Sequence, residues 1–113
     1  MIEKKVLDWL DTQLSVPVYM ERPLDVPASF VLLEKTGSSM ENWIYSVTVA
    51  VQSYAPTLLG AAELNELVKA AMLSMIERGD VSSVRLNSDY NYTDTATKSY
   101  RYQAVFDIVA YDD

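Results

Sequence analysis

The sequence contains no cysteine and no histidine, and only three of its 113 residues are glycine. Without cysteine it can form neither a disulfide framework nor a thiolate zinc site. Without histidine it lacks the commonest general base and metal ligand at neutral pH. Gly37, Gly60 and Gly79 lie too far apart in the sequence to form a phosphate-binding loop or a dinucleotide fingerprint.

Positive charge is also scarce, because the sequence has nine basic and sixteen acidic residues and its formal net charge is -7. A wide negative field repels phosphate backbones, so we expect no sequence-specific nucleic-acid binding and no binding of duplex DNA. No apolar run approaches the roughly 18 residues of a membrane span. The charged start, "MIEKKVLDWLDTQL", is unlike a signal peptide. We therefore expect a soluble protein made in a cytoplasm, with no membrane partner.

Motifs for catalysis and metal binding are missing as well. There is no G-x-S-x-G nucleophile elbow. In "DYNYTDTATKSY", residues 89–100, Asp89, Asn91 and Thr93 have the spacing of calcium ligands. Asp94 and Tyr100 stand where a calcium loop needs glycine and glutamate. The sequence therefore predicts no enzyme, no cofactor and no metal.

Half of the residues are hydrophobic, and their spacing predicts the elements of the first half of the chain. Residues 2–14 have helical spacing, with Ile2, Val6, Trp9, Leu10 and Leu14 on the apolar side. Three prolines then limit residues 17–27 to a short strand and a loop. Strands are predicted at 29–37 and 43–54, with a turn at 37–42, so the two form a hairpin.

The second half predicts a helix over 57–78 and two further strands, 81–92 and 98–111. We expect one domain over 1–113 of the α+β class, a mainly antiparallel sheet of about four to five strands with two helices on one face. The expected order is α-β-β-β-α-β-β. The stripe by which the second helix should cover the sheet comprises Leu64, Leu67, Val68, Ala71, Met72 and Met75.

Four tyrosines flank the turn between the last two predicted strands. A three-residue loop at 95–97 would place Tyr92 opposite Tyr100, and Tyr90 opposite Tyr102. The even-numbered face near Phe106 and Ile108 is predicted to be core. Towards the tip, small polar residues surround the tyrosines and favour a contact with another protein, because tyrosine offers apolar area and a hydroxyl together.

Both hairpin tips are predicted to make subunit contacts, because polar, turn-rich loops that project beyond a sheet commonly carry function. The candidate interface residues are Ser38, Met40 and Glu41 in the first hairpin, and Tyr90, Tyr92, Asp94, Lys98 and Tyr100 in the second.

Three segments resemble a family of small phage tail-completion, or tail-terminator, proteins from tailed phages and prophages of Gram-positive bacteria. They are "VYMERP" at 18–23, "VAVQSYAPTLLGAAELNELVKAAM" at 49–72 and "SSVRLNSDYNYTDTATKSYRYQAVFDIVAY" at 82–111. The resemblance implies a subunit of a ring, expected to be hexameric, that caps the tail tube and helps to join the tail to the head. It also implies partnership with the major tail tube protein and with head-side connector proteins, in a virion assembled in the host cytoplasm.

Two other functions fit the same sequence. One is a neck or connector subunit on the head side, and the other is a small monomeric ligand-binding module. The resemblance carries no motif whose residues have assigned roles.

Overall fold

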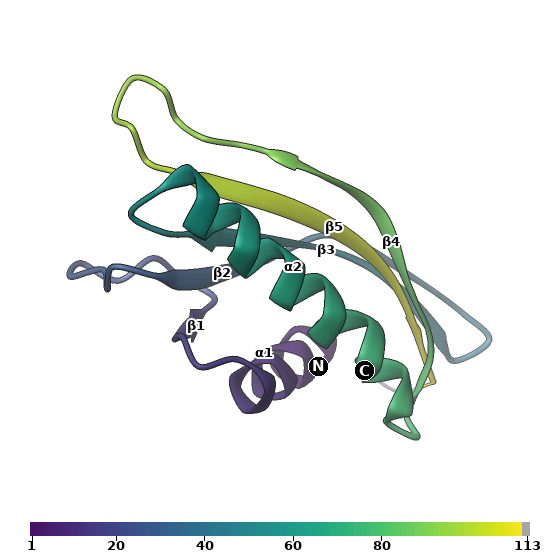
Figure 1. The fold of residues 1–113 in the computed structure, drawn as a ribbon. Coiled ribbons are helices and arrows are strands. Elements are labelled where there is room, and N and C mark those ends of the chain that lie inside the picture. The colour runs from purple at the N-terminus through teal and green to yellow at the C-terminus, as the bar shows by residue number, and fades with distance from the viewer. Residues whose placement is uncertain (112–113) are drawn as a thin grey trace.

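The computed structural model describes residues 1–111, which form one five-stranded sheet with two helices on one face (Figure 1). The predicted α+β class and the order α-β-β-β-α-β-β are confirmed. The elements are α1 (Ile2–Gln13), β1 (Val18–Tyr19), β2 (Phe30–Glu41), β3 (Ile44–Tyr54), α2 (Leu58–Ser74), a short 3-10 helix η1 (Met75–Glu77), β4 (Val81–Asn91) and β5 (Arg101–Ala110).

The strands lie in the order β1-β2-β3-β5-β4. Only β1 and β2 pair in parallel, and every other pair is antiparallel. The central pair, β3 with β5, keeps an unbroken register from Tyr45 opposite Ala110 to Tyr54 opposite Arg101. The register shifts lie in β2, between Lys35 and Gly37, and at two places in β4.

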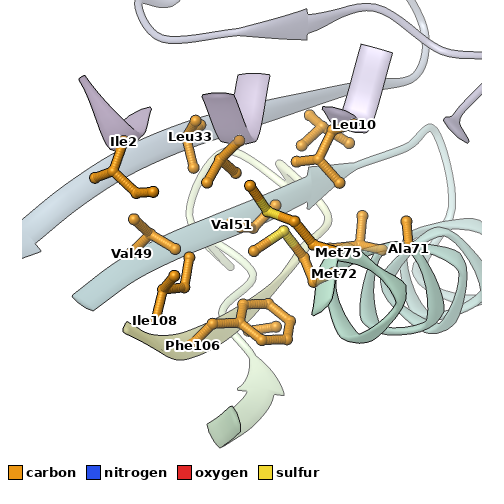
Figure 2. Packing of buried hydrophobic residues seen from close by; sticks show 14 of the residues in the cluster. Ile2, Leu10, Leu33, Val49, Val51, Ala71, Met72, Met75, Phe106 and Ile108 are labelled. Carbon is orange, nitrogen blue, oxygen red and sulfur yellow. The ribbon is translucent and has the colours of Figure 1, made fainter. Parts of the chain in front are cut away.

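The hydrophobic core lies between the sheet and the helices, and it confirms the predicted period-two pattern of β3 (Figure 2). Val47, Val49 and Val51 of β3 point to this layer, as do Phe106 and Ile108 of β5. The core face of β5 is thus the even-numbered one, as predicted. From the helices come Ile2, Val6 and Leu10 of α1, and Leu64, Val68, Ala71, Met72 and Met75 of α2 and η1.

Helix α2 begins where the Thr57 side chain caps it, accepting a hydrogen bond of 3.0 Å from the Gly60 N–H. The prediction that Leu67 belongs to its core stripe is wrong, because this side chain is 58% exposed. At 100° per residue, Leu67 lies next to the outward-facing Glu63 and Ala70, although its neighbour Val68 is fully buried. The sequence alone could not separate them, because α2 carries leucines on both sides.

The first hairpin turns later than predicted. Strand β2 continues through Ser38 and Met40 to Glu41, and the turn consists only of Asn42 and Trp43. Gly37 lies at the register shift rather than in the turn. Trp43, predicted to begin the second strand, is the second turn residue, with a φ of 66°.

Candidate interaction surfaces

The two long hairpins project at opposite ends of a molecule that is 45 Å long (Figure 1). The β2–β3 turn lies beyond the Tyr45–Ala110 pair, and the β4–β5 loop lies beyond the Tyr54–Arg101 pair. The structure therefore divides the predicted interface residues into two separate sets. Ser38, Met40 and Glu41 lie towards one end, and Tyr90, Tyr92, Asp94, Lys98 and Tyr100 lie towards the other.

The tip of the β2–β3 hairpin exposes large apolar side chains beside Glu41, and its turn is strained. Asn42 and Trp43 have φ values of 52° and 66°, the sign pattern of a type I′ turn. Asparagine tolerates this conformation, but a bulky side chain at positive φ is a true outlier. The Trp43 side chain is 79% exposed, and Met40 and Ile44 beside it are exposed too. Sequence reasoning missed Trp43 because its place in the turn depends on the register shift at Gly37.

The β4–β5 loop contains four residues, 95–98, instead of the predicted three. Asp94 and Ser99 close it with two backbone hydrogen bonds of 3.1 Å. The Asp94 carboxylate accepts hydrogen bonds inside the loop, from Thr97 first and from the Ala96 N–H, and these hold its pKa below the usual range. Lys98 completes the loop at a φ of 54°. This loop is thus polar and held by its own hydrogen bonds.

The fourth loop residue shifts the register by one, so the predicted tyrosine pairs are wrong. Tyr90 lies opposite Gln103, and Asn91 lies opposite Tyr102. A register shift also lies between Leu86 and Ser88. Even-numbered side chains of β4 point to the helix side before this shift and to the helix-free side after it. Tyr90 therefore lies on the face of the sheet without helices. Tyr100 is half-buried at the root of the hairpin, where its carbonyl accepts a hydrogen bond from the Ala55 N–H.

Aromatic rings and two arginines form a band across the helix-free face near this root. Phe30 and Tyr54 stack with ring centroids 4.4 Å apart, and the Arg22 guanidinium lies over both rings. Arg101 lies over Tyr54 and Tyr92, 4.5 Å from the Tyr92 ring. Arg101 also donates hydrogen bonds to the Tyr54 hydroxyl (2.8 Å) and the Tyr92 carbonyl (2.7 Å). The band joins β2, β3, β5 and the hairpin tip.

Basic side chains divide between the two faces of the sheet. The five with a carboxylate within 4.0 Å lie on the helix side: Lys4, Lys5, Lys35, Lys69 and Arg78. Within residues 1–111, the other four have no such ion pair, and they lie on the helix-free face or its hairpin tip: Arg22, Arg85, Lys98 and Arg101. These cations share the helix-free side of the sheet with carboxylates, because Asp107 lies opposite Arg85 and exposed Glu34 lies opposite Ala50 of β3.

The residues with calcium-ligand spacing are engaged in hydrogen bonds and ion pairs of the fold itself. Asp89 accepts hydrogen bonds from Asn65 (3.0 Å) and Lys69 (2.9 Å) of α2. The Asn91 side-chain oxygen accepts from both the N–H and the hydroxyl of Thr93. Within residues 1–111, no group of three or more acidic, cysteine or histidine side chains could hold a metal ion. None of the helices in this part of the chain is long and apolar enough to cross a membrane.

No protein-family model matches the chain, and a search of curated proteins finds no match.

Proposed function

We propose that this protein is a structural, non-enzymatic subunit of a phage virion that caps the tail tube and helps to join the tail to the head. The proposal rests on the resemblance of three segments to tail-completion proteins. One structural observation supports it above the others: two chemically different hairpins project at opposite ends of one elongated sheet (Figure 1).

A capping subunit needs two unlike ends. A tube of stacked rings exposes a heterologous end that could go on adding subunits. The subunit that stops it must match the tube on one side and differ from it on the other. Here one tip presents Met40, Trp43 and Ile44, whereas the other presents the polar loop between Asp94 and Ser99. An exposed tryptophan flanked by aliphatic side chains is typical of a binding anchor.

In this proposal the subunits form a ring, expected to be a hexamer, between the major tail tube protein and the head-side connector. Assembly takes place in the cytoplasm of the bacterial host. The same two-ended shape also suits a neck or connector subunit on the head side, which is the alternative role.

Electron microscopy of phage particles that lack the gene tests the role. A terminator predicts filled heads without tails, beside tails that are unjoined or abnormally long. Normal-length tails already fixed to heads would refute it. Normal-length tails without heads would instead favour the connector role.

The two hairpin tips can be tested separately in the same phage. We expect Glu41→Lys and Lys98→Glu to reduce the yield of complete virions, because each reverses an exposed charge at one tip. Asp11→Lys, an exposed charge on α1, is the matched control. Purified variants should melt like the parent, which separates an assembly defect from a folding defect. Normal virion yields from both tip variants would place the contacts elsewhere.

A further inference from the structure

The tip of the β2–β3 hairpin exposes apolar side chains on both faces of the sheet. Met40 pairs with Tyr45, which packs against the core, so Met40 points to the helix side. Ile44 pairs with Glu41 and points to the helix-free side. Trp43 lies at the end of the hairpin, and it is the most exposed of the three apolar side chains. A flat partner surface could cover only one face of this tip, whereas a pocket could surround it.

Trp43 occupies a turn position where tryptophan is unfavourable. It is the second residue of a turn with type I′ signs, where glycine is the usual residue. The fold gains little packing from the indole, because most of it is exposed. Backbone strain of this kind is typical of functional sites. It therefore points to a contact that the indole makes with another molecule.

A shallow hollow lies beside the tryptophan on the helix-free side of the tip. It has a volume of about 250 Å³ and is lined by Ser39, Glu41, Asn42, Ile44 and Ser46. Glu41 is exposed and has no ion pair within residues 1–111. Residues 38–46 contain no lysine or arginine, so the hollow offers a carboxylate beside hydroxyl and amide groups. These groups suit the ammonium or guanidinium group of a partner's basic side chain.

We infer that this tip inserts into a pocket at the exposed end of the tail tube. The Trp43 indole enters an apolar interior, and the Glu41 carboxylate meets a basic residue at the rim. The inference rests on the proposed function and deepens it, because it names the contact by which the cap binds the tube.

The chemistry of the two tips favours the tube as the partner of this one. In the proposed role the subunit binds the tube before the head. The β2–β3 tip suits this first contact, because exposed apolar surface promotes aggregation until it is covered. The polar loop between Asp94 and Ser99 can stay in water until the head joins. The lack of basic side chains at the β2–β3 tip disfavours an anionic membrane as its partner.

Co-sedimentation with purified tails of a phage that lacks the gene tests the contact. A concentration series of the subunit gives its affinity for the tails. Trp43→Ala should weaken binding at least about thirtyfold, the loss typical of a central anchor residue. Glu41→Lys should weaken it at least about tenfold, because the new lysine would face the partner's basic residue. High salt should reduce the effect of Glu41→Lys but not that of Trp43→Ala.

Leu24→Ala is the matched control. Leu24 is a fully exposed apolar side chain, but it lies between β1 and β2, outside the tip. This variant should bind tails like wild type. Because the Leu24, Glu41 and Trp43 side chains are all exposed, the three variants should melt close to wild type, which separates a binding defect from a folding defect.

Burial of the indole can be measured directly in protein labelled with 5-hydroxytryptophan, which is excited apart from the tails' own tryptophans. The chain has two tryptophans, and Trp9 belongs to the fold, where its indole N–H donates to the Ala71 carbonyl (2.7 Å). Labelled Trp43→Phe reports on Trp9 alone, so the difference from labelled wild type reports on position 43. Acrylamide should quench this emission several-fold less in the presence of saturating tails.

Several results would overturn the inference. They are wild type that does not bind tails, Trp43→Ala that binds like wild type, or an indole that bound tails leave equally open to acrylamide. Protection of the indole by neutral phosphatidylcholine vesicles would assign the tip to a membrane instead. Protection by a rise in subunit concentration without tails would assign it to a second copy.

The result can be separated from the role in the phage. A terminator phenotype in the gene deletion, combined with normal tail binding by Trp43→Ala, would keep the proposed function and remove this contact. If the deletion mutant assembled normal virions, and tails released from them still bound the subunit through Trp43, the contact would stand and the proposed function would fall.

Discussion

Replacing Trp43 by glycine should make the isolated subunit more stable, although it removes a large aromatic side chain. A non-glycine residue in the left-handed region costs roughly 1–2 kcal/mol, and Trp43 has a φ of 66°. Glycine removes that cost. It also gives the unfolded chain more conformational freedom, which lowers the unfolding free energy by about 0.4–1 kcal/mol. Because the side chain is 79% exposed, little burial is lost. The net gain in unfolding free energy is therefore about 0.5–1 kcal/mol.

For a domain of this size, such a gain raises the melting temperature by roughly 2–5 °C, which circular dichroism can measure. Trp43→Ala is the control, because alanine loses the indole but keeps the unfavourable φ, so it should give no gain. If Trp43→Gly melted at or below the parent temperature, the turn would not be strained in the way its dihedral angles indicate. A more stable variant that impairs virion assembly would show that the tryptophan is kept for a contact.

Three further predictions concern single side chains. Leu67→Asp should change the unfolding free energy by less than about 0.5 kcal/mol, whereas Val68→Asp should cost several kcal/mol, because only Val68 is buried; urea denaturation distinguishes them. Hydrogen bonds from Arg78 and then Lys5 lower the pKa of Asp80 to about 2. That carboxylate therefore stabilises the fold above about pH 4, and the contribution is lost as pH falls towards 2. Asp80→Asn should cost about 1 kcal/mol at neutral pH after solvent screening, and its denaturation midpoint should converge with the parent's in acid; a constant gap would contradict this. Arg101→Lys should speed amide exchange around Tyr92, since lysine cannot make both of arginine's hydrogen bonds; unchanged exchange would show that the band does not hold the hairpin.

The fold class can be predicted from patterns of hydrophobic residues and prolines within short segments of the sequence. The alternation in β3, the prolines at 17–27 and the apolar spacing of α1 each belong to a few adjacent residues, and all three predictions are confirmed. The error at Leu67 has a different source. When a helix carries leucines all round, spacing cannot tell which ones face the sheet, and only tertiary packing decides.

The candidate surfaces depend on register, which local patterns do not specify. Because the β4–β5 loop has four residues instead of three, the cross-strand partner of Tyr90 is Gln103 and not the predicted Tyr102. Because of the register shift between Lys35 and Gly37, the first turn consists of Asn42 and Trp43 and not of the predicted residues 37–42. The Arg22 and Arg101 band joins residues far apart in the sequence, so no short motif could have shown it.

The positions of the bulges limit how copies of this protein can join. Each register shift lies on an edge segment, in β2 beyond its short partner β1 or in β4, and the β3–β5 pair has none. Bulges twist an edge away from regular pairing, so a further strand cannot add a long ladder of backbone hydrogen bonds. Joining must then use side-chain surfaces, which salt, substitution and a fitting partner can tune. Edges of this kind disfavour the edge-to-edge strand pairing by which sheet proteins aggregate, so we expect the isolated protein to resist fibre formation.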